Sequence, residues 1–169
     1  MEEELREIER NHTWELATLP HNKRPIGVKW VYKVKVKSTG EIANYEARLV
    51  AKGFLQNAGL DYNVVFALVA RIETIRLVVA STTFRGWSLH QLDVKSALLN
   101  CPLEEEVHVD QPPTFKVTRH EDKVYKLKRA LYGLRKALQT WNKRTNHILL
   151  QLGFRNCTEK YGIYVRATI

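Results

Sequence analysis

The chain has 169 residues, 44% of them hydrophobic, which is enough for one folded domain and excludes disorder as the default. Its formal net charge of +9 favours an anionic partner, most often nucleic acid. No apolar run is long enough to cross a bilayer, and the acidic N-terminus is unlike a secretory signal. We therefore expect no membrane partner and an intracellular location, in the cytoplasm or the nucleus.

The positive charge is concentrated in two blocks. Residues 22–52 have 8 basic and 2 acidic side chains, and residues 116–144 have 10 basic and 2 acidic ones. Residues 53–115, between these blocks, have 4 basic and 7 acidic side chains. This pattern is typical of a groove whose walls bind phosphates and whose floor presents carboxylates. Two solvated basic faces without a ligand explain it equally well.

The first half of the chain predicts a helix and a hairpin. Residues 2–10 predict a short charged helix. Residues 28–37 alternate apolar side chains with lysines, which indicates a half-buried strand with an apolar face and a lysine-rich face. Residues 38–40 (STG) form a turn, and residues 42–52 predict the returning strand. The result is a hairpin with many lysines.

The second half predicts further strands and two helices. Residues 74–84 predict a helix that ends at 85–86, and the alternation over 87–93 predicts a second strong strand. A helical turn is expected at 97–99, then short strands at 107–109 and 124–127. An apolar stripe from about 134 to 152 predicts a longer helix ended by a glycine, and 161–165 predict a last strand. The class is α+β.

Asp93 is the carboxylate that most suggests chemistry. It ends a predicted strand, where a carboxylate can reach solvent on a fixed backbone, and phosphoryl transfer by metal ions needs oxygen ligands in such positions. A lone aspartate at a strand end is, however, more often a turn former. His90 and His108 have no partner at metal-ligand spacing, and Tyr132 and Trp141 suit either base stacking or a core.

Eight segments, in this order and spacing, resemble the copia-type retrotransposon reverse transcriptases over nearly the whole chain. They are 11–16 (NHTWEL), 27–33 (GVKWVYK), 47–54 (ARLVAKGF), 69–76 (VARIETIR), 89–97 (LHQLDVKSA), 105–107 (EEV), 111–113 (QPP) and 131–134 (LYGL). The resemblance implies a right-handed polymerase, with fingers over about 22–85, an incomplete palm over about 86–169, and an antiparallel sheet packed on helices.

The resemblance also implies roles for individual residues. Asp93 would be the first catalytic aspartate and would bind Mg²⁺ together with the backbone carbonyl of Val94. Arg48 would contact the phosphates of a deoxynucleoside triphosphate, which a bidentate guanidinium suits, and Ala97 and Leu98 would lie at the nucleotide. The residues implied at the RNA template, the DNA primer or the RNA–DNA hybrid are Lys33, Lys35, Lys52, Arg135 and Lys136.

Five positions depart from the family pattern, and two of them, Leu68 and Leu138, stand where the family usually has prolines. Leu98 stands where the family has a phenylalanine that excludes a ribose 2′-hydroxyl. Cys101 replaces a turn glycine, where a side chain is expected to be strained. Glu46 replaces a basic residue beside Arg48, where a carboxylate is expected to repel a triphosphate.

The family's Tyr-Val-Asp-Asp motif is absent from the sequence, so we expect a fragment of a Pol polyprotein that ends before this motif. Without that aspartate pair, two metal ions cannot both be held at the reacting atoms. Three hypotheses stay open: an RNA-directed DNA polymerase by descent that is inactive as this chain, a non-catalytic basic nucleic-acid-binding remnant, and the product of a non-functional pseudogene.

Overall fold

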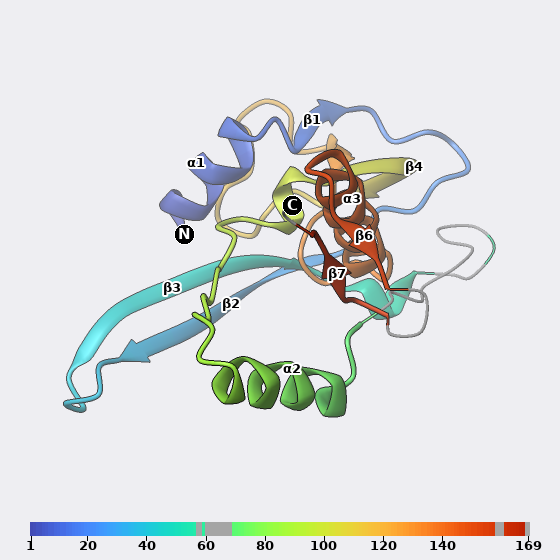
Figure 1. Cartoon of the computed structure of the whole chain (residues 1–169). Coiled ribbons are helices and arrows are strands. Elements are labelled where there is room, and N and C mark those ends of the chain that lie inside the picture. Colours follow the sequence, from blue (N-terminus) through green and yellow to red (C-terminus); the bar gives the residue numbers. More distant parts are fainter. Residues whose placement is uncertain (57–58, 60–68, 158–160, 168–169) are drawn as a thin grey trace.

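A computed structural model describes residues 1–56, 59, 69–157 and 161–167. The chain combines helices with antiparallel strands, as the α+β prediction requires (Figure 1). The elements are α1 (Glu2–Arg10), β1 (Trp14–Ala17), β2 (Val28–Val36), β3 (Ile42–Ala51), η1 (Gly53–Leu55), α2 (Ile72–Phe84), η2 (Leu98–Asn100), β4 (Pro102–Val109), β5 (Val124–Arg129), α3 (Ala137–Gln151), β6 (Arg155–Asn156) and β7 (Tyr164–Val165).

Within the described residues, the strands form three antiparallel sheets. One sheet has the order β1-β5-β4, the second is the β2–β3 hairpin, and the third is the short β6–β7 pair. In the hairpin Val28 pairs with Ala51 and Val31 with Arg48, so the lysine-rich strand and the arginine-bearing strand lie side by side.

Two backbone bridges join the base of the hairpin to the rest of the fold. The amide of Ile26 donates to the carbonyl of His108 at 2.8 Å, which connects the start of the hairpin to β4. The amide of Ala51 donates to the carbonyl of Tyr132 at 2.7 Å, which connects the end of β3 to the loop after β5. These bridges fix where the hairpin leaves the packed part of the chain.

The core lies between the hairpin base, η2, β4, β5 and the start of α3. Its fully buried side chains include Leu49, Leu99, Val109 and Leu131. Ile8 of α1 is also fully buried, so the N-terminal helix packs on this core. Three glutamates in the first turn of α1 and an arginine in its last suit the helix dipole.

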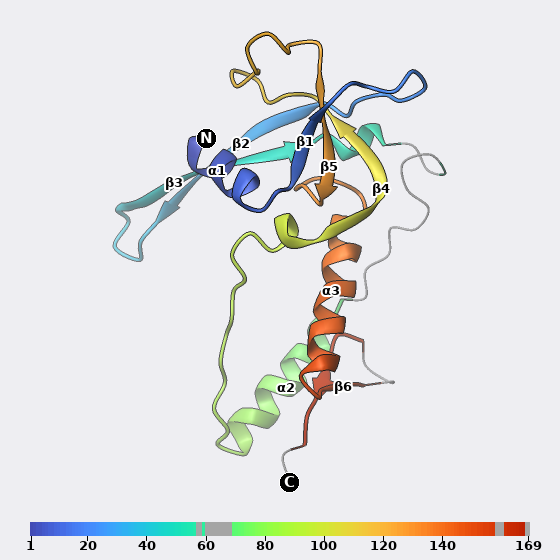
Figure 2. The same ribbon diagram turned by 90° about the horizontal axis from the view of Figure 1, so that it is seen from above.

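The prediction of a half-buried β2 is correct only at the hairpin base. Val28 is buried, whereas Tyr32, Val34 and Val36 on the same face are 50–65% exposed. Figures 1 and 2 show the reason: the hairpin projects away from the β1-β5-β4 sheet, so its outer half has no neighbouring layer to cover an apolar face.

The predicted strand over residues 87–93 is wrong. These residues belong to no strand, and Trp87, Leu89 and Leu92 are 58–89% exposed. A strand needs a neighbour for its backbone N–H and C=O groups, and no described segment pairs with this one. The alternating apolar and polar side chains of this segment therefore do not form the two faces of a sheet.

The expected strain at Cys101 is also absent. Its backbone is extended, with φ −96° and ψ 117°, and its side chain is fully buried. A side chain is readily tolerated in this conformation, so the residue packs as a small core side chain.

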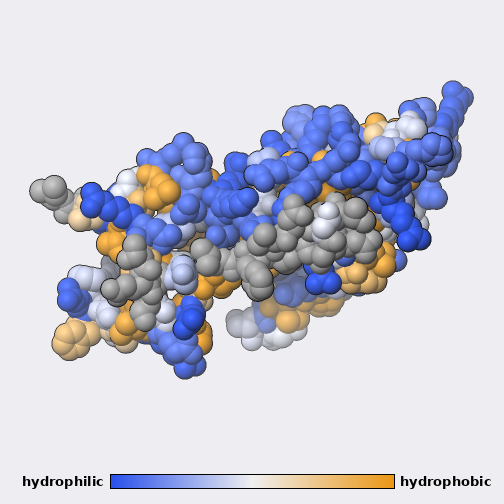
Figure 3. All heavy atoms as spheres, turned by 90° about the vertical axis from the view of Figure 1, so that its right-hand side faces the viewer, coloured by the Kyte–Doolittle hydropathy of each residue, from blue (hydrophilic) through white to orange (hydrophobic). Residues whose placement is uncertain are grey.

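The helix predicted at 74–84 forms, as α2, but its apolar residues face outward. Only Thr74 in α2 is buried, and Leu77 is 61% and Phe84 92% exposed. In both ribbon views α2 lies apart from the β1-β5-β4 sheet (Figures 1 and 2). The space-filling view shows apolar patches open on the molecular surface (Figure 3). Among the described residues, no helix is long and apolar enough to cross a membrane.

Candidate nucleotide and nucleic-acid site

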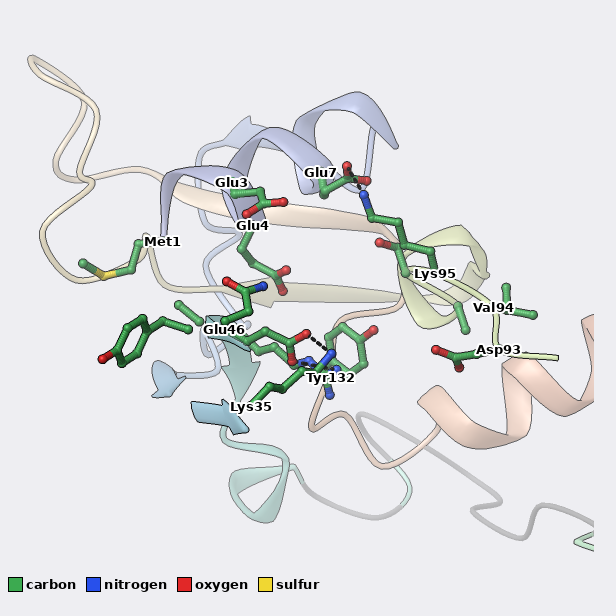
Figure 4. A pocket seen from close by; sticks show the side chains of 16 residues that line it. Met1, Glu3, Glu4, Glu7, Lys35, Glu46, Asp93, Val94, Lys95 and Tyr132 are labelled. Atoms are coloured by element: carbon green, nitrogen blue, oxygen red, sulfur yellow. Dashed lines mark hydrogen bonds and ion pairs between the residues drawn. The ribbon is translucent and has the colours of Figure 1, made fainter. Parts of the chain in front are cut away.

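A cavity of about 450 Å³ lies where α1, the β2–β3 hairpin and the segment after α2 meet (Figure 4). Five of the predicted site residues line it: Lys35 from β2, Arg48 from β3, Asp93 and Val94 from the segment after α2, and Ala97 just before η2. Tyr132 from the loop after β5 lines it as well. Segments far apart in the sequence are thus brought to one cavity.

Arg48 sits between an aromatic ring and a carboxylate. Its guanidinium carbon is 5.3 Å from the centre of the Tyr132 ring, a cation–π distance. Its Nη2 is 3.6 Å from Oε2 of Glu46, and about half of the Arg48 side chain is exposed. The ring and the carboxylate orient the guanidinium while leaving it open to a ligand.

Glu46 forms ion pairs with two cations of the cavity, Arg48 and Lys35. The hydrogen bond from Lys35 lowers the pKa of Glu46, although partial burial opposes the shift. The carboxylate is therefore held in its charged form. Its negative charge offsets the positive charges of Lys35 and Arg48, which would otherwise attract an anionic ligand. This effect has the same direction as the repulsion of a triphosphate that the sequence predicts for Glu46.

Tyr132 is positioned by Gly133, whose backbone has φ +88°. A Cβ atom on Gly133 would lie 2.2 Å from the carbonyl oxygen of Ala51, so only glycine allows this close approach of the loop to β3. Burial raises the pKa of the Tyr132 hydroxyl, with Arg48 opposing the shift. The ring is thus a neutral, half-buried wall of the cavity.

Asp93 is exposed and lies on an irregular segment rather than at a strand end. Figure 4 shows its carboxylate turned toward the side of the cavity formed by Tyr132. Within the described ranges, no group of three or more His, Cys, Asp or Glu side chains could hold a metal ion. Asp93 and the backbone carbonyl of Val94 would supply two oxygen ligands, fewer than a two-ion site needs.

The contribution of α1 to the cavity was not predicted from the sequence. This helix lines one side of the cavity with Glu3, Glu4 and Glu7, as Figure 4 shows. Oε1 of Glu7 is 3.1 Å from Nζ of Lys95, and Oε1 of Glu4 accepts the amide of Leu49 at 3.4 Å. The acidic composition of the helix was visible in the sequence, but its position over the cavity was not.

The other predicted contacts lie elsewhere. Leu98 is buried in the core and does not line the cavity. The Lys52 side chain lies over Gly27. Nε of Arg135 donates to the carbonyl of Gly53 at 3.2 Å, and Lys136 is paired with Glu105 and mostly buried. These three cations have internal contacts, and the structure does not bring them to the cavity.

Comparison with known proteins defines the class of protein. A family model described as "Reverse transcriptase (RNA-dependent DNA polymerase)" matches residues 11–168. The chain belongs to this family.

Two similar proteins indicate the group within this family to which the chain is related. The chain is 39% identical over 141 residues, 83% of its length, to the "Retrovirus-related Pol polyprotein from transposon TNT 1-94" of Nicotiana tabacum. It is 38% identical over 156 residues, 92% of its length, to that from transposon RE1 of Arabidopsis thaliana. The resemblance to copia-type retrotransposon enzymes is thereby confirmed.

The chain spans only 11% of the length of each of these two polyproteins. It is also 43% identical over 79 residues, 47% of its length, to 46% of the "Uncharacterized mitochondrial protein AtMg00820" of Arabidopsis thaliana. No solved structure matches the chain.

Proposed function

We propose that the chain forms the nucleotide- and template-binding part of an RNA-directed DNA polymerase, with the hairpin region as fingers and residues 86–169 as part of a palm. The proposal rests on one observation, the meeting of Arg48, Asp93 and Tyr132 at one cavity. A guanidinium stacked on a ring and open to solvent is suited to bind a phosphate with two hydrogen bonds.

The outer hairpin is the second part of the proposed surface. Lys33 and Lys35 on β2 and Lys37 directly after it alternate with valines, and the lysine side chains are exposed. Lys35 and Lys37 have carboxylate partners, whereas Lys33 makes no ion pair with any described residue. Such a row of cations attracts the backbone of an RNA template or an RNA–DNA hybrid without reading its sequence.

Magnesium stays a prediction. Enzymes of the reverse transcriptase family generally use a divalent metal, and Asp93 with the Val94 carbonyl would supply two oxygen ligands. The described residues bring no second carboxylate to this end of the cavity in a metal-binding group. The second candidate function is therefore non-catalytic binding of nucleic acid. It is favoured because Asp93 is the single carboxylate at this end of the cavity among the described residues.

The test is binding of a fluorescently labelled RNA–DNA hybrid, followed by anisotropy at several salt concentrations. Lys33→Gln is expected to weaken binding roughly 2- to 5-fold and to reduce the salt dependence, because one phosphate contact is lost. Lys116→Gln, the same charge change at an exposed site outside both surfaces, is the matched control. Equal effects of the two changes, or binding indifferent to salt, would reject the hairpin surface.

Primer extension separates the two candidates. With a homopolymer RNA template, a DNA primer, deoxynucleotides and magnesium, we expect no incorporation by the purified chain, because one carboxylate does not hold two metal ions. Template-dependent incorporation that is lost in Asp93→Asn would show that the chain is a polymerase by itself.

A further inference from the structure

Helix α1 lies outside the part of the chain that the family model matches. The match begins at residue 11, and α1 ends at Arg10. Nevertheless α1 contributes Glu3, Glu4 and Glu7 to the wall of the Arg48 cavity, and Met1 directly before the helix lines it as well. A segment outside the matched region thus makes one side of the candidate site.

The position of α1 is fixed by packing. Ile8 is fully buried in the core, and Leu5 packs against the same core. The amide of Thr13 donates to the carbonyl of Ile8 at 3.1 Å, and the amide of Leu49, next to Arg48, donates to Glu4. The acidic face is therefore held over the cavity by the same contacts that complete the fold.

The charges of the cavity are unusual for a site that is to bind a polyanion. Its lining side chains include five carboxylates, Glu3, Glu4, Glu7, Glu46 and Asp93, but only three cations, Lys35, Arg48 and Lys95. These lining side chains together have a net charge of −2. Without the first ten residues the lining would have three cations and two carboxylates, a net +1.

One of the three cations, Lys95, is paired with a carboxylate of α1. Glu7 forms an ion pair with Lys95 at 3.1 Å. Glu4 lies near enough to Arg48 for the guanidinium to favour its charged form, although burial is the larger effect and raises the Glu4 pKa. The carboxylates of Glu4 and Glu7 would repel an incoming triphosphate, which would have to displace them to reach Arg48 and Lys95.

We propose that the acidic helix α1 competes with the anionic ligand for Arg48 and Lys95 and keeps the cavity in a low-affinity state. This inference rests on the proposed function, because it supposes that the cavity binds phosphate groups. Removing the carboxylates of α1 from the cavity would raise affinity without any new contact, through loss of like-charge repulsion and release of Lys95.

The experiment measures binding of inorganic triphosphate by isothermal titration calorimetry. The test variant Glu4→Gln/Glu7→Gln keeps the helix and its buried Ile8, and circular dichroism checks that it is folded. The control variant Glu2→Gln/Glu9→Gln removes two carboxylates from the same helix at positions that do not line the cavity. We expect the test variant to bind roughly 10-fold more tightly than wild type at low salt, and the control to gain less than about 3-fold.

Three further outcomes are decisive. A gain that shrinks at high salt and disappears when Lys95→Gln is added supports competition by α1. If wild type binds, Arg48→Gln weakens binding and the test and control variants gain equally, the α1 inference is overturned while the proposed function stands. If no variant binds triphosphate, including the test variant, the α1 inference and the anion-binding role of the cavity both fall.

Discussion

The β1-β5-β4 region and the α2 segment show that apolar content does not determine burial. Strand β5 has the sequence VYKLKR, half of it basic, yet its Val124 and Leu127 are buried because β1 and β4 pair with it on both sides. Helix α2 is far more apolar, yet only Thr74 is buried. A neighbouring element, more than composition, decides which apolar side chain stabilises this fold.

The largest effect expected from this comparison is a core truncation. Leu99→Ala removes a fully buried side chain of η2, and we expect a loss of ~2–5 kcal/mol in the free energy of unfolding, from lost transfer energy and the remaining cavity. Urea unfolding followed by circular dichroism measures it. Leu77→Ala in α2 is the matched control, at a side chain 61% exposed, with an expected change within about 0.5 kcal/mol. Similar losses in the two variants would contradict the contrast between the regions.

A smaller but more local effect is expected at the junction that positions Tyr132. Gly133→Ala places a Cβ 2.2 Å from the Ala51 carbonyl at a φ of +88°, so we expect at least ~1–3 kcal/mol of destabilisation together with weaker triphosphate binding. Gly40→Ala has a similar φ of +85° but no atom within 4 Å of its Cβ, so it measures the backbone cost alone. If both variants lose the same stability, the close approach of the loop to β3 is not important.

The pH dependence of stability probes the packed region through His108. Burial lowers the pKa of His108 below its ordinary value, and its Nδ1 is buried without a hydrogen-bond partner among the described residues. Above about pH 6.5 the imidazole is neutral in both states; below it, the unfolded chain takes up the proton more readily, so stability falls as pH falls.

The expected slope from this histidine is less than about 1.4 kcal/mol per pH unit. Unfolding midpoints between about pH 7.5 and 5.5 measure it for wild type, His108→Gln and the exposed control His120→Gln. We expect the slope to decrease in His108→Gln alone. An unchanged slope there would mean that another group dominates the acid sensitivity.

Long periodic patterns in the sequence predicted their elements correctly, whereas the shorter alternation over 87–93 did not. The hairpin was predicted because the alternation in β2 extends over nine residues. Helix α3 was predicted because its apolar stripe extends over more than two helical turns. Arg48 and Asp93 line one cavity, and the roles that the resemblance implies for them stay predictions. β1 was missed because its four residues are too few to show a period. The α1 carboxylates were missed because their role depends on tertiary packing through Ile8 rather than on any motif.

The smallest expected effect on stability concerns the exposed apolar side chains of α2, and it tests whether they are a liability. Leu77→Gln/Phe84→Gln alters side chains that are 61% and 92% exposed, so the unfolding free energy is expected to change by less than about 0.5 kcal/mol. The same change should raise the monomer fraction in size-exclusion chromatography, because contiguous exposed apolar surface promotes association. Tyr161→Gln and Val165→Gln, exposed apolar positions in the C-terminal part, serve as single-site controls. A sharp monomer peak already in wild type would show that the apolar surface of α2 does not drive association. The β1-β5-β4 region and the α2 segment would then differ only in what they contribute to stability.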